Sequence, residues 1–396
     1  MNILVQPGQT LWSISQTFGI PLNLIADSNP NVIPTQLQVG QNLRIPGYRV
    51  LAHRIQPGDT FWSISNRYQT PMDVIRLMNP WTIPTQLMIG STLYVPVRLT
   101  ERIVQTRKAY DYSSLQQDLQ RLRQAYPFIR QESIGQSVLG SSIDEIQIGR
   151  GAQMVQANSS FHANEWITTP IMIQFLNDYL LALTNQTPIR GLSMNPFYTR
   201  RTLSLVPMVN PDGVNLVLNG PPNIEPYRSQ VIEMNQGNLT FNNWKANIRG
   251  VDLNNQFPAG WEIEKERKEQ SPGPRDYPGE APLTEPESIA MAELTNRRNF
   301  SRVNAFHTQG EVIYWGFRNQ EPPEAAAIVK EYARVSGYKP VQTVDSYAGY
   351  KDWFIQEWNR PGYTVELGTG VNPLPLSQFD EIYEESLGIF LANLYM

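Results

Sequence analysis

The sequence predicts an α/β protein in which a mixed sheet covered by helices is preceded by two small βααβ domains. The first observation behind this is a repeat: Val5–Ser15 recurs as Ile55–Ser65, at an offset of 50 residues, and Gly40 matches Gly90 at the same offset. A search for such repeats comes first because it decides the architecture. The second observation is that strand-like and helix-like segments alternate through the rest of the 396-residue chain, which is long enough for roughly two to three domains.

Each copy of the repeat predicts a strand, two short helices and a second strand. A Pro-Gly turn precedes Thr10 or Thr60, a residue type that caps helix N-termini, and the apolar spacing that follows is helical. A proline then opens a second short helix, and an alternating segment predicts the closing strand. We place the two domains at residues 1–47 and 50–97.

These residues resemble the LysM module in both copies, which implies binding to glycans that contain N-acetylglucosamine. In that family the glycan lies against the loop after the first strand and the loop before the second. The resemblance implies glycan contacts from two matching sets of residues: Gly8, Gln9, Thr10 and Ile33, and Gly58, Asp59, Thr60 and Ile83. The alternative is that the modules act only as structural spacers.

Composition limits the partners and metal ligands that the chain can use. The formal net charge of −4 and the pI of about 5.6 argue against a nucleic-acid or anionic-membrane partner. Cysteine is absent, so a transition metal would need carboxylates and the three histidines, His53, His162 and His307. No apolar run reaches the ~18 residues of a membrane span, and no signal peptide is visible, so we expect neither membrane insertion nor an export signal.

A polar connector, residues 98–108, leads to a large domain that we expect over residues 109–396. Helices are expected from Asp111 through Ala125, after Glu165, and over Phe379–Tyr395. Strands are expected at residues 143–148, 154–156, 202–209, 303–306 and 364–367. The loop at residues 271–282 is rich in proline and glycine and is expected to stay on the surface.

His162 and Glu165 have a spacing that suits metal ligation. An imidazole from a loop and a carboxylate from the following helical turn can converge on one cation. The pair alone is weak evidence, because an acid near a helix start also stabilises the helix dipole. Further motifs follow in order: Asn210-Pro-Asp-Gly213, Gly250-Val-Asp-Leu-Asn254, His307 at a strand end, and Thr364-Val-Glu-Leu367.

Together these motifs closely resemble those of the zinc carboxypeptidase family, over residues 108–396. The resemblance implies one Zn²⁺ per chain, with His162, Glu165 and His307 as ligands and a fourth position for water. It implies Glu366 as the general base, and Asp252 as the residue that fixes the tautomer of the first histidine.

The sequence departs from the carboxypeptidases at the clamp for the substrate's terminal carboxylate. The family's Asn-Arg pair is Asn254-Asn255 here, and Asn164 replaces an arginine inside the first motif. Neutral amides cannot replace a guanidinium clamp, so the sequence favours cleavage within a peptide. The family's oxyanion-stabilising arginine corresponds to Lys245, and Arg249 is the alternative.

Three residues near the C-terminal end bear on specificity. Tyr347 matches the family's tyrosine that closes over the substrate, with Tyr350 as the alternative. Lys351 falls where the family's specificity residue lies, and its charge would suit an acidic substrate side chain. The alternative is an ordinary solvated lysine.

A peptidase joined to two glycan-binding modules implies a substrate that is both glycan and peptide, as peptidoglycan is. The meso-diaminopimelate of its stem peptides carries a free carboxylate that would match Lys351. The whole arrangement resembles wall peptidases of sporulating bacilli, which implies cleavage of the γ-D-glutamyl–meso-diaminopimelate bond.

Two alternatives to this function remain, and the expected location follows from the same resemblance. One alternative is a carboxypeptidase on wall or ordinary peptides, in which Arg249 holds the carboxylate. The other is an inactive wall-binding protein. The expected place of action is the cell wall, reached from the cytoplasm of a sporulating cell after lysis, or the spore.

Overall fold

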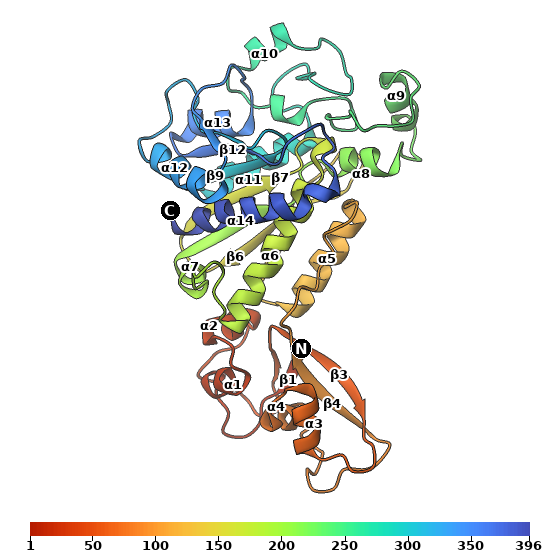
Figure 1. Cartoon of the computed structure of the whole chain (residues 1–396), viewed down its shortest axis with the longest axis vertical. Coiled ribbons are helices and arrows are strands. Elements are labelled where there is room, and N and C mark those ends of the chain that lie inside the picture. The colour runs from red at the N-terminus through yellow and green to blue at the C-terminus, as the bar shows by residue number, and fades with distance from the viewer. The chain divides into compact units, whose positions relative to one another are not determined.

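Each copy of the repeat folds as a βααβ module in the computed structural model, which describes residues 1–396. The first module consists of β1 (Asn2–Leu4), α1 (Leu11–Phe18), α2 (Leu22–Ser28) and β2 (Asn42–Arg44). The second consists of β3 (Tyr48–Arg54), α3 (Phe61–Tyr68), α4 (Met72–Met78) and β4 (Thr92–Arg98). The two strands of each module pair antiparallel (Figure 1).

The first helix of each module begins at the predicted cap. The Thr10 side chain accepts a hydrogen bond from the backbone N–H of Ser13 at 3.0 Å, and Thr60 does the same for Ser63. Such a cap satisfies a backbone donor that the helix leaves unpaired. The capped helices then bury their apolar stripe, with Ile14 and Ile64 fully enclosed.

The chain divides into two compact units. The first comprises residues 1–104, 118–130 and 176–196, and the second comprises residues 105–117, 131–175 and 197–396. The first unit thus includes both modules together with parts of α5 (Tyr112–Ala125) and α6 (Thr168–Asn185).

The large sheet has eight strands in the order β11-β10-β12-β9-β7-β8-β6-β5. Its strands are β5 (Arg130–Gln136), β6 (Ser142–Gly149), β7 (Gln153–Ser159), β8 (Arg201–Val206), β9 (Arg302–His307), β10 (Val312–Tyr314), β11 (Lys339–Val341) and β12 (Gly362–Glu366). The central strands β8, β7, β9 and β12 run parallel, whereas β6 pairs antiparallel with β8 and β10 pairs antiparallel with β12. The sheet is therefore mixed, as the sequence predicted.

The remaining helices surround this sheet. They are α7 (Asn195–Arg200), α8 (Pro211–Asn219), α9 (Tyr227–Met234), α10 (Trp261–Arg267), α11 (Pro286–Arg298), α12 (Glu324–Ser336), α13 (Tyr350–Trp358) and α14 (Phe379–Tyr395). Three short 3₁₀ turns complete the fold: η1 (Ala163–Glu165), η2 (Leu253–Asn255) and η3 (Leu376–Gln378).

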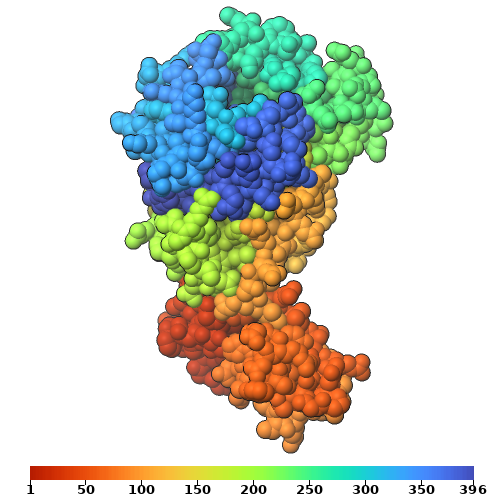
Figure 2. Space-filling view, viewed as in Figure 1, coloured from red at the N-terminus to blue at the C-terminus, as the bar shows by residue number.

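The alternation along β9 shows how helices cover both faces of the sheet. Val303 and Ala305 belong to the apolar core that α11 and α13 complete. Phe306 points the other way and stacks on Phe390 of α14, with ring centroids 4.5 Å apart. On that second face α12 and α14 lie side by side, and they form adjoining parts of the surface in Figure 2. Because successive strand residues alternate between faces, His307 shares the face of Val303 and Ala305.

The loop at residues 271–282 differs from the sequence prediction. Its first half is on the surface, but Tyr277 is buried. The carbonyl of Tyr277 accepts a hydrogen bond from the N–H of Asp252 at 2.8 Å, and the carbonyl of Pro274 accepts one from Lys245 at 2.7 Å. The segment from Lys245 to Asp252 has no strand partner, so this loop supplies the acceptors that its buried backbone needs. The expectation that this loop stays on the surface therefore fails at residues 277–279, which are buried.

Candidate metal centre

The parallel strands bring the predicted site residues to one edge of the sheet. His307 is the last residue of β9 and Glu366 is the last of β12, and the two are direct neighbours in the register. His162 and Glu165 follow the end of β7, which pairs in parallel with β9. Carboxyl ends of parallel strands are where α/β sheets usually bind ligands.

His162, Glu165 and His307 converge on one point. The Nδ1 atom of His162 lies 2.8 Å from one Glu165 oxygen, and the Nδ1 atom of His307 lies 2.9 Å from the other. The two Nδ1 atoms are 3.1 Å apart, and all three residues are buried.

This donor set fits a zinc ion. Two imidazole nitrogens and one carboxylate oxygen form a usual three-residue ligand set, with a fourth position left for water or substrate. The three ligand groups are buried and lie close enough together to bind a single metal ion. Burial alone would raise the pKa of Glu165, but the charges and hydrogen bonds of both histidines outweigh it and lower the pKa to about 2.

Asp252 supports the first histidine from behind. Its Oδ1 atom lies 3.3 Å from Nε2 of His162, on the ring edge away from Glu165. Burial would raise the pKa of Asp252, but Lys245 and His162 hold it well below its usual range. A charged carboxylate in this place orients the imidazole and fixes the nitrogen that carries the proton.

Lys245 lies within this cluster, whereas Arg249 lies apart from it. The Nζ atom of Lys245 is 2.7 Å from Asp252 and 3.3 Å from Asp276. Burial would lower the pKa of Lys245, but the two carboxylates raise it, so the side chain stays charged. The Arg249 guanidinium is half-exposed and lies 3.6 Å from Glu285. This geometry favours Lys245 of the two candidates for the oxyanion-stabilising cation.

Glu366 has the electrostatic environment of a proton acceptor. Burial raises its pKa, and the neighbouring Glu165 raises it further, while His307 and Lys245 act in the opposite direction. The balance sets the pKa at about 7. A carboxylate with a pKa near the working pH can both accept and return a proton.

The three asparagines predicted to contact substrate differ in whether their side-chain polar atoms have hydrogen-bond partners. Asn254 Oδ1 accepts a hydrogen bond from the N–H of Tyr350 at the start of α13, which gives it a structural role. Asn164 and Asn255 are buried, and each keeps one side-chain polar atom without a partner, Oδ1 in Asn164 and Nδ2 in Asn255. Buried amides normally find partners, so these two have groups left for a ligand.

The two tyrosine candidates separate clearly. Tyr350 is fully buried, and its hydroxyl lies 2.8 Å from the Thr295 hydroxyl within the core. Tyr347 is half-buried, and its ring lies between the guanidinium groups of Arg267 and Arg318, at 5.2 and 5.1 Å from the ring centre. The partial exposure of Tyr347 favours it of the two candidates, and its role over a substrate stays a prediction.

Lys351 has partners within the protein. Its ammonium is buried, forms an ion pair with Asp352 and donates to the carbonyl of Gly316 at 2.8 Å. The alternative of a solvated surface lysine was therefore wrong. The Asp352 pair also leaves less of the positive charge for a substrate carboxylate.

Sequence reasoning missed Lys268 and Asp276. The Nζ atom of Lys268 lies 3.3 Å from Oδ1 of Asn255, the residue at the family's clamp position, and 3.5 Å from Glu264. Lys268 follows α10 and Asp276 lies in the proline-rich loop, and neither is part of a motif. A lysine three residues before a turn-rich loop carries no signal that could have identified it.

The residues predicted to bind glycan fall into structural and exposed groups. Thr10 and Thr60 cap helices, and Asp59 Oδ2 lies 2.8 Å from Nε2 of His53 while accepting from the N–H of Gln56. Gly8 and Gly58 have positive φ angles of 79° and 88° in the turns, and Ile33 and Ile83 are exposed.

Gln9 lines a groove of about 360 Å³ between the two modules, together with residues of α4 such as Asp73 and Arg76. These roles were predicted from family position, and the geometry shows only where each side chain lies.

Exposed tryptophans add an unpredicted feature to the modules. Trp12 and Trp62 occupy the same position in α1 and α3 and are 63% and 66% exposed, and Trp81 is 90% exposed. Large aromatic side chains left in solvent are typical of binding surfaces.

Known protein families match both parts of the chain. The zinc carboxypeptidase model matches residues 115–388, and the LysM domain model matches residues 3–46 and 53–96. Gamma-D-glutamyl-L-diamino acid endopeptidase 1 of Lysinibacillus sphaericus is 65% identical over 396 residues, which is 100% of both chains. YqgT, an uncharacterized protein of Bacillus subtilis (strain 168), is 46% identical over 303 residues, 76% of this chain and 81% of its own.

Solved structures share the fold at lower identity. Bovine thrombin-activatable fibrinolysis inhibitor, in complex with tick carboxypeptidase inhibitor, superposes with a TM-score of 0.56 at 17% identity, covering 73% of this chain and 97% of that one. Carboxypeptidase A from Helicoverpa armigera gives 0.55 at 16% identity, covering 88% and 97%. The strand-edge triad of His162, Glu165 and His307 is thus a zinc site, and the chain belongs to the zinc carboxypeptidase family, with two LysM domains at its N-terminal end.

Proposed function

We propose that this chain is a zinc-dependent endopeptidase that cleaves the bond between γ-D-glutamate and meso-diaminopimelate in peptidoglycan stem peptides. The observation that carries the proposal is the intact catalytic set beside an altered clamp, in which Asn255 stands at the carboxylate-binding arginine's position. The name and full-length identity of the Lysinibacillus sphaericus relative support the choice of bond.

The geometry accounts for peptide hydrolysis by water. Zinc held by His162, Glu165 and His307 supplies the Lewis acidity that polarises a carbonyl group and makes water more acidic. Glu366 accepts the proton of the attacking water and returns it to the leaving amine, and a pKa of about 7 suits both transfers. Lys245 provides a fixed positive charge for the oxygen that becomes negative in the transition state.

The ammonium group of Lys268, which lies beside Asn255, supports a substrate with an internal carboxylate. Lys268 is within reach of Asn255, and its charge also acts on Asp252 and Asp276. A carboxylate on the diamino acid can meet Lys268 while the peptide continues beyond it. Lys351 stays a prediction for the same role, with Asp352 already beside it.

The modules support a substrate within the cell wall. Two LysM domains that bind peptidoglycan glycan raise the concentration of stem peptides at the catalytic site. None of the helices has the length and apolar character needed to span a bilayer. Action at the wall follows from this substrate, and residence in a sporulating cell or spore stays a prediction.

The test uses the zinc-loaded full chain and the tetrapeptide L-Ala-γ-D-Glu-meso-diaminopimelyl-D-Ala, with mass spectrometry of the products. We expect L-Ala-D-Glu and meso-diaminopimelyl-D-Ala. The Glu366→Gln protein should lose about 10²–10⁴-fold in rate while it still binds zinc, and Glu357→Gln, an exposed carboxylate in α13, serves as the matched control. Release of free D-Ala would instead identify a carboxypeptidase, and no cleavage by zinc-loaded protein would reject the proposal.

A further inference from the structure

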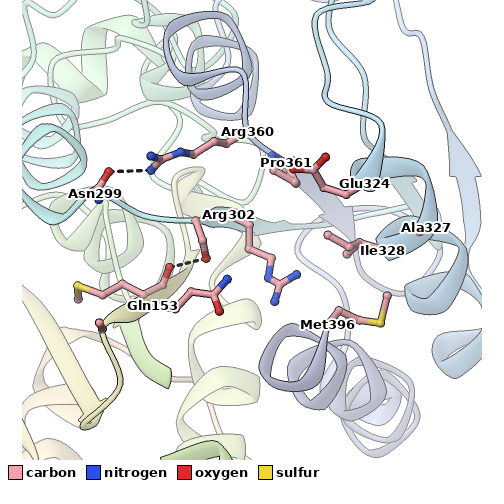
Figure 3. Close-up of a pocket in the computed structure, with 12 residues that line it drawn as sticks. Gln153, Asn299, Arg302, Glu324, Ala327, Ile328, Arg360, Pro361 and Met396 are labelled. Atoms are coloured by element: carbon pink, nitrogen blue, oxygen red, sulfur yellow. Dashed lines mark hydrogen bonds between the residues drawn. The ribbon is translucent and has the colours of Figure 1, made fainter. Parts of the chain in front are cut away.

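A second cavity lies at the edge of the sheet opposite to the metal centre. β9 ends at His307 in the metal site and begins at Arg302, which lines this cavity of about 460 Å³. Side chains from β7, β9, α12 and the loops before β9 and β12 surround it, among them Gln153, Asn299, Glu324 and Arg360 (Figure 3). Five residues of extended strand separate the two ends of β9 by roughly 16 Å, so the cavity is separate from the zinc site.

Arg302 points into this cavity with a charge that the protein leaves unpaired. The residue is only 3% exposed, yet its Nε atom has no hydrogen-bond partner. One guanidinium nitrogen donates to the carbonyl of Asn393 at 3.2 Å, and no carboxylate lies within ion-pair distance. A buried charge without a counter-charge is costly, and proteins normally pair it.

The neighbours of Arg302 add donors. Arg201 of β8 lies directly beside Gln153 of β7 in the sheet, and its side chain is on the same face as that of Arg302. The Nη1 atom of Arg201 is buried and has no hydrogen-bond partner. Burial lowers the pKa of Arg201, and the nearby charge of Arg302 lowers it further. The Nδ2 atom of Asn393 is also unpartnered. Three buried donors therefore lie close together and lack an acceptor.

The rest of the wall carries charges of both signs. Arg360 donates to the Asn299 side chain at 2.8 Å and to the carbonyl of Phe300 at 2.6 Å, and it retains its charge without a carboxylate partner. The negative groups among the lining residues are the side chain of Glu324, which is exposed at the start of α12, and the terminal carboxylate of Met396.

We propose that this cavity binds a small oxyanion, the group shared by inorganic phosphate and small carboxylates, with Arg302 as its principal ligand. A planar guanidinium can donate two parallel hydrogen bonds to such a group, and the cavity has the size of small-molecule sites. The anion supplies the acceptor that Arg302 lacks. The site is independent of the peptidase function.

Isothermal titration calorimetry of the zinc-loaded full chain with sodium phosphate and, separately, with sodium succinate tests the proposal. We expect one saturable site, and Arg302→Met should weaken binding at least tenfold. Arg334→Met is the matched control, because Arg334 is an exposed arginine of α12 that pairs with Glu331, and it should stay within twofold. Binding of phosphate alone, succinate alone or both identifies which source of the oxyanion the site accepts.

Thermal unfolding gives a second measurement of anion binding, which still applies if a variant is less stable than the wild type. Phosphate or succinate should raise the unfolding midpoint of the wild type and of Arg334→Met. Arg302→Met should melt at or above the wild-type temperature without anion, because an unpaired buried charge is gone, and should gain nothing from the anion. Saturable binding that survives in Arg302→Met, as binding at zinc would, overturns the proposal, and so does the absence of binding by both anions.

Discussion

At the residue scale, one carboxylate connects a metal ligand, His162, with Lys245. Asp252 is buried between His162 and Lys245, and each of its oxygens faces one of them. The metal ligands, and the place of Glu366 beside them, could be predicted from sequence because these residues lie in recognisable motifs. Lys268 could not, because only tertiary packing brings it to Asn255.

Replacing Asp252 by asparagine should weaken zinc binding by about 10- to 100-fold, as loss of such a support usually does. The amide offers no negative charge to Nε2 of His162, so the ring orientation is no longer fixed. Competition with a fluorescent zinc chelator measures the effect. Asp276→Asn is the control, since Asp276 contacts Lys245 but not the histidine, and equal losses in both variants would show that the effect comes through Lys245.

Replacing Lys268 by methionine should raise KM for a stem peptide with a free diaminopimelate carboxylate by about tenfold or more, given 1.5–3 kcal/mol for a charged hydrogen bond. A substrate with that carboxylate amidated should show no change. Steady-state kinetics on both substrates separates recognition from structural damage. Lys265→Met, in α10 itself, is the control, and an equal rise for both substrates would contradict a recognition role.

At the scale of elements, the long buried strands of the large sheet were predictable, whereas β5, β10 and β11 were not. The expected strands at residues 143–148, 154–156, 202–209, 303–306 and 364–367 correspond to β6, β7, β8, β9 and β12. β10 and β11 have three residues each, too few to show alternation, and the exposed polar residues of β5 hide its pattern. The helix expected after Glu165 starts only at Thr168, because a 3₁₀ turn first places Glu165 toward the histidines.

The start of α11 makes stability depend on pH through Glu287. Burial raises the pKa of this carboxyl, and Asp212 raises it further, while hydrogen bonds from backbone N–H groups and Asn247 lower it, to leave a pKa of about 7. A raised pKa means that the folded state holds the proton more tightly than the unfolded state. The free energy of unfolding should therefore fall as pH rises from about 4.5 through 7 and then level off, by about 3 kcal/mol from this group.

Glu287→Gln should flatten that part of the pH profile. The amide carbonyl can still accept from the N–H of Val138, which Glu287 does at 3.1 Å, so the fold should be retained. Urea unfolding at pH 5 and pH 8 gives the difference for each protein, and Glu293→Gln, exposed on the same helix, should behave like the wild type. Parallel profiles for wild type and Glu287→Gln would contradict the role of Glu287.

At the scale of the whole molecule, glycan binding and hydrolysis are carried by separate segments of one chain. The repeat in the sequence was enough to predict both modules, because each copy carries its own cap, turn and core residues. The exposed aromatic surface could not be predicted, since the spacing of Trp12 and Trp62 in their helices does not show that they face solvent.

Substituting Trp12, Trp62 and Trp81 together by alanine should separate the two activities. All three side chains are mostly exposed, so their loss should leave the module cores intact. Binding to insoluble peptidoglycan should weaken by about tenfold or more, and digestion of intact wall should slow accordingly, because tethering no longer concentrates the enzyme on its substrate. The kcat/KM for the soluble tetrapeptide should stay within twofold, as should every activity of Leu239→Ala, an exposed apolar control outside the modules. If wall digestion by the triple variant matched the wild type, the tryptophans would not contribute to tethering, whereas a parallel loss on the soluble peptide would show that the modules act on the catalytic site itself.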